Sequence, residues 1–310
     1  MTRRTWDELP PAVRAAIEQQ TGPVLAADIP NAGRNSDFSA TLRVHGDVLF
    51  CKGISDAEGK RGQMHRHERD VNRYLPSAVA PRLRWSTETA GWLLLGFDKL
   101  PGRHADLSPG SPDLPLVADT VTTMARELAH TTAAAPLLAE QWARLAAWRR
   151  LATHRADLDE WARGQVDVLI EWERLAIELV NGESLVHTDL HSLNIVAGDG
   201  RAHVVDWAWS RLGNPAIDVA FLVNRLIAAG HTPNAAELWA DTVPVWRATP
   251  ENARTAFSVA ILGIWEHVQR HNGLPPGAGL TAAARRWAQH RLDSRTSQTE
   301  ATHSRAWTPN

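Results

Sequence analysis

Residues 185–209 read LVHTDLHSLNIVAGDGRAHVVDWAW, and this stretch decides the fold. Two apolar runs, at 185–186 and 203–205, have the character of short β-strands. The polar loop between them ends in Gly-Asp-Gly at 198–200, the kind of turn that reverses a β-hairpin. The rest of the chain can be read as support for this loop and its turn.

Four polar residues of this stretch stand where its strands end. His187, Asp189 and Asn194 form the pattern H-x-D-L-x-x-x-N, and Asp206 follows the second run directly. This is the spacing of a kinase catalytic loop and its metal-binding aspartate. Phosphoryl transfer needs a carboxylate that accepts the proton of the attacking hydroxyl, and oxygen ligands for Mg²⁺ on the nucleotide phosphates. The pattern therefore predicts Asp189 as the base, with Asn194 and Asp206 as Mg²⁺ ligands.

A purely structural interpretation of these residues is weaker. An isolated Asp or His in a loop is usually a cap or turn residue. Four polar residues at fixed offsets, with a hairpin turn between them, are hard to obtain by accident. The pattern favours catalysis, although His187 is expected to pack on the catalytic loop and bond its backbone rather than touch substrate.

The stretch resembles the aminoglycoside phosphotransferase family, the small-molecule branch of the protein-kinase-like fold. Members of that family carry H-x-D-x-x-x-x-N and a metal aspartate in a D-W or D-F-G-like element. The resemblance implies a two-lobed α+β fold with the nucleotide between the lobes. The small β-rich N-terminal lobe would span residues 1–98 and the larger helical lobe residues 99–293. The polar segment 294–310 reads as a loose tail.

Two departures from protein kinases point to a small-molecule acceptor. Thr188 stands where protein kinases have the arginine that grips a phosphorylated activation loop. Only eight residues separate Asp206 from Pro215. That distance leaves no room for an activation loop or for a platform that binds peptides.

Composition limits the possible partners and the compartment. A net charge of -2 offers no basic face for nucleic acid. The single cysteine, Cys51, permits no internal disulfide and fits a reducing compartment. No run approaches the 18 apolar residues of a membrane helix, and the N-terminus lacks the apolar core of a signal peptide. We expect a cytoplasmic protein with no membrane or nucleic-acid partner, and the oligomeric state stays open.

The first hundred residues alternate between helical and β patterns. A helix is expected over 5–20, and strands over 24–27, 41–44 and 48–52. The segment between the first two strands is where kinases place their phosphate-covering loop. It has one glycine instead of G-x-G-x-x-G, but small polar residues such as Asn35 and Ser36 could present backbone N–H groups to phosphate oxygens.

Lys52 ends the third strand in Leu-Phe-Cys-Lys, comparable to the V-A-I-K element. A lysine there must reach solvent or meet an acid and a phosphate. In the helix predicted over 63–75, Glu68 falls on the apolar face and is the natural partner of Lys52. The alternative is that Glu68 is surface charge beside Arg66 and Arg69.

Two more strands, at 82–85 and 92–95, precede Gly96-Phe97-Asp98. The resemblance implies that Gly96, Phe97 and Asp98 form the hinge, where backbone groups would bond the edge of a purine.

Beyond the Pro- and Gly-rich linker at 101–114, the chain outside the catalytic stretch is almost wholly helical in pattern. Helices are expected over 116–132, 136–153, 157–181, 234–247, 250–271 and 280–293. The resemblance implies that Asp218 braces the catalytic loop and that the surrounding helices line the acceptor cleft. Residues 231–310 hold six acidic residues against eight arginines. That balance is not the acidic wall that a polycationic aminoglycoside favours.

The predicted reaction transfers the γ-phosphoryl group of ATP or GTP to a hydroxyl of a small molecule, such as an antibiotic or other natural product. One alternative is a metabolite kinase for choline-, sugar- or amino-alcohol-like acceptors. Another is a nucleotide-binding pseudokinase, which the intact set of polar residues opposes and the glycine-poor loop favours. A helical scaffold with accidental motifs would bind no nucleotide with Mg²⁺.

Overall fold

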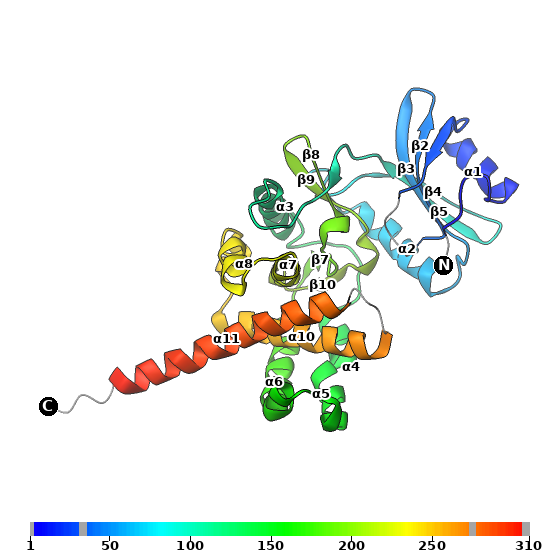
Figure 1. Cartoon of the computed structure of the whole chain (residues 1–310). Helices are drawn as coiled ribbons and strands as arrows, with labels where there is room; N and C mark the ends of the chain where they lie inside the picture. The colour runs from blue at the N-terminus through cyan, green and yellow to red at the C-terminus, as the bar shows by residue number, and fades with distance from the viewer. Residues whose placement is uncertain (1–2, 31–35, 273–276, 306–310) are drawn as a thin grey trace.

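The N-terminal part of the chain is built on one antiparallel sheet (Figure 1). In the computed structural model, which describes residues 3–30, 36–272 and 277–305, the strands of this sheet lie in the order β1-β2-β3-β5-β4. Their bounds are β1 Ala26–Asp28, β2 Phe38–Val44, β3 Asp47–Ile54, β4 Leu83–Thr89 and β5 Trp92–Asp98. Each strand run predicted in this part of the sequence overlaps one of these strands.

One face of the sheet is covered by α1 (Pro11–Thr21), whose buried residues include Val13 and Ile17. The helix begins later than the prediction at residue 5, because Pro10 and Pro11 start it and proline suits a first helical turn. The predicted capping contact exists, since the Thr5 N–H donates to the Glu8 carboxylate at 2.6 Å. It closes a separate turn before the helix.

The opposite face carries Lys52 and receives α2 (Lys60–Asn72). Side chains alternate across a strand, so Cys51 packs in the cluster under α1 while Lys52 faces the other way. The helix ends before the predicted position, where the buried Asn72 side chain bonds the backbone of the segment that follows. Its amide donates to Pro81 O at 2.9 Å, and its oxygen accepts the Leu83 N–H at 2.6 Å.

The Gly-Asp-Gly turn joins β8 (Ile195–Gly198) to β9 (Arg201–Val204). Asp199 and Gly200 both have positive φ, at 51° and 73°, as a two-residue hairpin turn requires. The strand that precedes the predicted catalytic loop, β7 (Ser184–Val186), pairs with β10 (Arg211–Gly213). The short strand β6 (Arg103–His104) pairs with β8. The strands β6, β8 and β10 were not predicted from the sequence.

The remainder of the chain is helical apart from these short strands (Figure 1). The helices are α3 Asp113–Glu127, α4 Leu138–Leu145, α5 Ala147–Leu151, α6 Glu160–Leu179, α7 Ala216–Ala228, α8 Pro233–Ala240, α9 Pro244–Arg247, α10 Glu251–Asn272 and α11 Gly277–Arg305. Short 3-10 turns lie at Ala152–Asp157, Ser192–Asn194 and Trp207–Trp209.

Two helix predictions need correction. The helix expected over 136–153 is broken at Ala146, which has φ 35° and separates α4 from α5. At the other end of the lobe, α11 continues to Arg305, beyond the predicted helix end at residue 293. No glycine or proline lies between Leu280 and Arg305, so nothing in the backbone chemistry stops the helix there.

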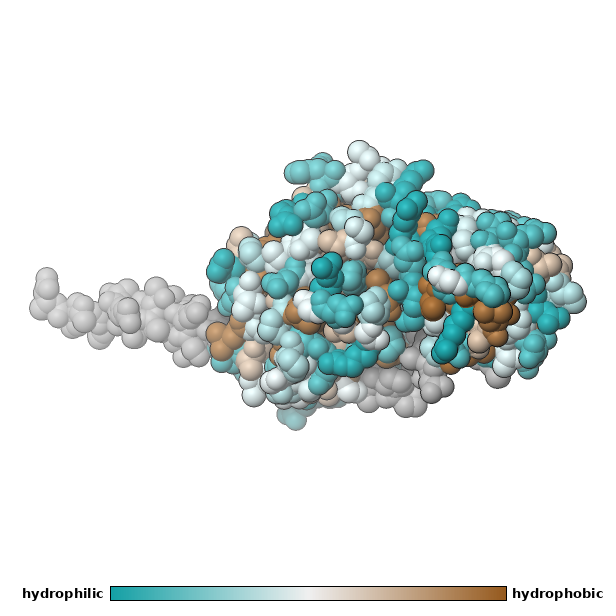
Figure 2. All heavy atoms as spheres, turned by 90° about the horizontal axis from the view of Figure 1, so that it is seen from above, coloured by the Kyte–Doolittle hydropathy of each residue, from teal (hydrophilic) through white to brown (hydrophobic). Residues whose placement is uncertain are grey.

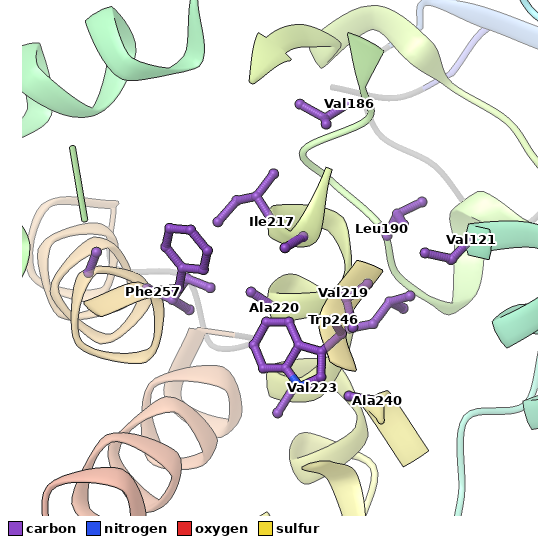
Figure 3. Packing of buried hydrophobic residues seen from close by; sticks show 14 of the residues in the cluster. Val121, Val186, Leu190, Ile217, Val219, Ala220, Val223, Ala240, Trp246 and Phe257 are labelled. Atoms are coloured by element: carbon purple, nitrogen blue, oxygen red, sulfur yellow. The ribbon is translucent and has the colours of Figure 1, made fainter. Parts of the chain in front are cut away.

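The core of this lobe surrounds α7, as Figure 3 shows. Ile217, Ala220 and Val223 of α7 are fully buried, and Phe257 from α10 is buried with them. A helix that is apolar over most of its surface belongs in a core. Leu190 of the predicted catalytic loop is also fully buried in this cluster, so the core anchors the loop.

The outer surface is mixed in polarity. Figure 2 shows hydrophilic residues over most of the face seen from above, with apolar residues scattered among them. None of the helices that the structure describes is both long and apolar enough to cross a membrane.

Candidate active site

His187 ties the predicted catalytic loop (residues 187–194, hereafter the catalytic loop) to the segment that leads into Asp206. Its imidazole is fully buried. Nε2 lies 3.0 Å from Val205 O, and Nδ1 lies 3.2 Å from the backbone nitrogen of Asp189. A ring that donates from Nε2 and accepts at Nδ1 satisfies both contacts. His187 therefore holds the predicted base and the predicted metal aspartate in a fixed relation, as a bonding residue of the loop.

Asp218 braces the same loop from the first turn of α7. Its carboxylate is 3% exposed and accepts the N–H groups of His187 and Thr188, both at 2.8 Å. Burial raises the pKa of Asp218, against the opposing effect of the His187 side chain and these two hydrogen bonds. Thr188 has φ 67°, a left-handed conformation that strains a residue other than glycine. The predicted brace is confirmed, and it holds a strained turn in place.

Asp189 lies partly open to solvent, with 35% of its side chain exposed. Oδ1 is 3.5 Å from Arg225 Nη2, and Oδ2 is 3.7 Å from His191 Nε2. The backbone oxygen of Asp189 accepts the side-chain amide of Asn194 at 2.9 Å. The Asn194 amide nitrogen is thus committed to the loop, and its oxygen is the atom left for a cation.

Asp206 brings the two lobes together at Lys52. Lys52 Nζ is 2.5 Å from Glu68 Oε2 and 3.3 Å from Asp206 Oδ1. Lys52 and Glu68 are 7% and 3% exposed, so the prediction that Glu68 faces inward to meet Lys52 is confirmed. Asp206 has φ 65°, a second left-handed residue in the site. Backbone strain of this kind clusters at functional positions.

Burial and neighbouring charges determine the protonation preferences of Lys52, Glu68 and Asp206. Burial raises the pKa of the Glu68 carboxyl to about 7, although the Lys52 ammonium opposes that shift. Burial alone would lower the pKa of Lys52, but the carboxylates of Asp206 and Glu68 outweigh it and raise that pKa. The same ammonium holds the pKa of Asp206 below its usual value. Lys52 therefore stays cationic between the two carboxyl groups.

The exit of the predicted phosphate loop is tied to α2. Ser36 Oγ is 3.1 Å from His65 Nε2, and His65 Nδ1 is 2.9 Å from Arg61 O, one turn earlier in the helix. His65 is 2% exposed, and burial together with the charge of Lys52 lowers the pKa of His65 to about 4. Ser36 is thus held through the helix that carries Glu68. Asn35, also predicted to face phosphate, lies outside the described residues.

The predicted hinge residues lie inside β5. Gly96 and Phe97 each have a partner on both sides, in β3 and in β4, and the Asp98 N–H donates to Arg82 O at 3.0 Å. Neighbouring strands therefore lie on both sides of these residues. The first residue without such a strand partner follows Asp98. The Phe97 ring nevertheless borders the site, because Lys52 Nζ lies 5.5 Å from its centre.

The oxygen atoms of Asn194 and Asp206 suit Mg²⁺. The described residues contain no cluster of three or more His, Cys, Asp or Glu side chains able to hold a metal ion. That is compatible with Mg²⁺, which is commonly held by one or two protein oxygens together with phosphates and water. The donors present on the protein therefore fit a cation that arrives with a nucleotide.

Sequence reasoning missed two residues of this site, His65 and Arg225. His65 lies three positions before Glu68 on the same helix, so the helical repeat could have placed it beside Lys52. No local pattern marks Arg225. It reaches Asp189 because α7 passes behind the catalytic loop, a relation between segments far apart in the chain.

Solved structures share the fold over most of the chain. The aminoglycoside phosphotransferase APH(4)-Ia is 18% identical with a TM-score of 0.62, over 91% of this chain and 96% of that one. An aminoglycoside phosphotransferase from Alicyclobacillus acidocaldarius is 15% identical with a TM-score of 0.58, over 97% and 98% of the two chains. The AMP-bound spectinomycin phosphotransferase APH(9)-Ia is 9% identical with a TM-score of 0.58, over 88% and 96%. The two-lobed, protein-kinase-like α+β fold predicted from the sequence is confirmed.

The sequence itself carries the family signal. No curated protein matches it significantly. The family model described as "Phosphotransferase enzyme family" matches residues 54–251, from the end of β3 to the start of α10. This is more than half of the 310 residues, and it includes Glu68, Asp189, Asn194 and Asp206. The chain therefore belongs to the phosphotransferase enzyme family.

Proposed function

We propose that the protein transfers the γ-phosphoryl group of ATP or GTP to a hydroxyl of a small molecule, an antibiotic or a related natural product. The observation that carries this proposal is the distance of 3.3 Å between Lys52 Nζ in the N-terminal lobe and Asp206 Oδ1 in the helical lobe. The cation proposed to bind phosphate therefore lies close to the carboxylate proposed to bind the metal, and His187 links the backbone of Asp189 to that of Val205, the residue before Asp206. The nucleotide would lie between residues 1–98 and 99–293, and the reaction would be cytoplasmic.

Each side chain has a role that its surroundings support. Lys52, anchored by Glu68, binds the α- and β-phosphates, and Ser36 helps to cover them. The purine edge meets the backbone where the predicted hinge of Gly96, Phe97 and Asp98 ends, just after Asp98 and next to the Phe97 ring, while Gly96 keeps the strand behind it close-packed.

Asp189 orients the acceptor hydroxyl and accepts its proton as the new O–P bond forms. The bond between the γ-phosphorus and the bridging oxygen breaks, and the nucleoside diphosphate leaves. Asn194 and Asp206 hold Mg²⁺, which neutralises charge on the phosphates when it is bound. The protein supplies position and electrostatics for this reaction.

The known complexes of a relative support a nucleotide and an antibiotic as the two substrates. A thermostable mutant of APH(4)-Ia was crystallised with ADP and hygromycin B, and another with AMP-PNP and hygromycin B. A metabolite kinase for choline-like, sugar or amino-alcohol acceptors would use the same nucleotide machinery. A pseudokinase would bind nucleotide without transfer, and the intact Lys52, Asp189, Asn194 and Asp206 speak against it.

Acceptor-dependent turnover tests the proposal. Nucleoside triphosphate consumption with Mg²⁺ should be measured across hydroxylated antibiotics, amino alcohols and sugars, for the wild type and for Asp189→Ala. Asp119→Ala, an exposed position on α3, is the matched control. We expect an acceptor to stimulate turnover, and Asp189→Ala to lose about a hundredfold or more while still binding nucleotide. Turnover that survives in Asp189→Ala would refute the assignment of the base.

A further inference from the structure

Arg225 places a positive charge against the proposed base. It lies in the last turn of α7, with its guanidinium 3.5 Å from Asp189 Oδ1 and 5.1 Å from the centre of the Trp265 ring. Its side chain is 18% exposed, and burial lowers the pKa of Arg225 while Asp189 opposes that shift. An arginine nevertheless keeps its charge in a protein. A fixed cation therefore stands where the acceptor must approach.

Most of the hydrogen-bonding capacity of Arg225 is unused. Among the described residues it donates one hydrogen bond, a single long contact to Asp189. A guanidinium has five N–H groups arranged as a fork that matches a carboxylate or a phosphate. None of its nitrogen atoms is among the buried side-chain atoms without a partner, so the remaining donors reach solvent. They are available to a molecule bound beside Asp189.

The acidic side chains of the neighbouring helices do not offset this charge. Each described acid of α8, α10 and the turn between them is already paired with an arginine: Glu237 with Arg291, Asp241 with Arg254, Glu251 with Arg291, and Glu266 with Arg270. A carboxylate neutralised in this way is a poor partner for the ammonium groups of a polyamine. His191, whose ring lies 3.7 Å from Asp189 Oδ2, adds no negative charge.

Most of the acidic side chains on the exposed face of α6 are also paired with arginines. Three of its exposed acids, Asp167, Glu171 and Glu178, pair with Arg155 or Arg174, whereas Glu160 in the first turn is exposed without an ion pair among the described residues. The acidic run read from the sequence is therefore a solvated surface with its own counter-charges. On α8, α10 and this part of α6, the described carboxylates are therefore paired with arginines and leave few free partners for a polycation.

We propose that Arg225 selects an acceptor that carries an anionic group, a carboxylate or a phosphate, close to the hydroxyl that is phosphorylated. This inference rests on the proposed function, because it takes Asp189 as the group that receives the proton of that hydroxyl. The anion occupies the free side of the guanidinium fork and turns the neighbouring hydroxyl toward Asp189. A polycationic acceptor would instead bring its ammonium groups close to the positive charge of Arg225, which repels them.

A matched series of hexoses that differ in charge tests the proposal. Turnover with Mg²⁺ and ATP should be measured for glucose, glucosamine, glucuronate and glucose 6-phosphate, so that the last two separate carboxylate from phosphate. We expect kcat/KM for an anionic member to exceed that for glucose at least tenfold, and glucosamine to be the poorest. Arg225→Gln should remove this preference, and Arg225→Glu should reverse it in favour of glucosamine.

A control variant separates charge selection from general damage to the protein. Arg174→Glu makes the same charge change on the exposed face of α6, where Arg174 is 53% exposed, and should leave the order of acceptors as in the wild type. Thermal unfolding checks that each variant is folded. A merely structural role for Arg225 would lower turnover of all four probes alike, and such a uniform loss would overturn the proposal.

The remaining outcomes distinguish this proposal from the proposed function. If the wild type binds nucleotide but prefers glucosamine, or if no anionic probe raises turnover above the rate without acceptor, selection by Arg225 is refuted and phosphoryl transfer stands. If the wild type binds no nucleotide with Mg²⁺, both proposals fail together.

Discussion

Replacing Asp218 with alanine removes the brace beneath the catalytic loop. Its carboxylate is 3% exposed and accepts two backbone N–H groups at 2.8 Å. A buried donor left without an acceptor costs about 1–3 kcal/mol, so two would cost about 2–6 kcal/mol. The partial exposure of Thr188 and the removal of a buried carboxylate both reduce this cost. We expect the free energy of unfolding to fall by about 2–4 kcal/mol.

Urea unfolding of the wild type, Asp218→Ala and Asp218→Asn measures this loss. Asparagine keeps one acceptor oxygen, so its loss should be about half that of alanine. Because Thr188 is held at φ 67°, the loosened loop should lower acceptor turnover more than nucleotide affinity. Asp119→Ala on the surface of α3 controls for the loss of an acidic residue. An alanine variant as stable and as active as that control would refute the brace.

Three further predictions concern the N-terminal lobe. The folded protein keeps the pKa of His65 near 4, below the usual 6.5, so it binds fewer protons than the unfolded chain between these values. Stability should therefore fall by about 2 kcal/mol from pH 7 to pH 5, and His65→Gln should flatten this loss in urea titrations. Gly96→Ala would place a Cβ 2.2 Å from the Trp85 ring and should destabilise by about 1–3 kcal/mol, whereas Gly164→Ala, in open space on α6, should not destabilise. Glu68→Gln removes one partner of a buried ion pair and should cost up to about 3 kcal/mol in urea unfolding, since Asp206 still faces Lys52; an unchanged midpoint would contradict it.

The residues that the sequence predicted well are those whose neighbours lie close along the chain. The catalytic loop could be read because its polar residues stand at fixed offsets from short apolar runs. The inward position of Glu68 followed from the helical repeat of α2. Lys52 was recognised from its apolar strand, although β3 does not end at Lys52 as predicted and continues to Ile54. In each case a periodic pattern fixes the direction in which the side chain points.

What the sequence could not predict depends on packing between distant segments. Arg225 meets Asp189 only after α7 is buried among α10 and the catalytic loop. The strand β10 pairs with β7, but its residues show no alternation of apolar and polar side chains that would mark a strand. The break at Ala146 is fixed by packing as well, because Glu173 of α6 accepts the N–H of Trp148 at 2.8 Å and caps the new helix.

Magnesium-dependent nucleotide binding tests the central claim most directly. Titration calorimetry should compare ADP binding with and without Mg²⁺ in the wild type, in Asp206→Asn and in the surface control Asp119→Asn. The proposed site predicts that Mg²⁺ tightens ADP binding in the wild type and in the control, and that Asp206→Asn loses most of this effect because Mg²⁺ loses a charged ligand. Equal tightening in Asp206→Asn, or no ADP binding by the wild type, would contradict a nucleotide and metal site at Lys52 and Asp206.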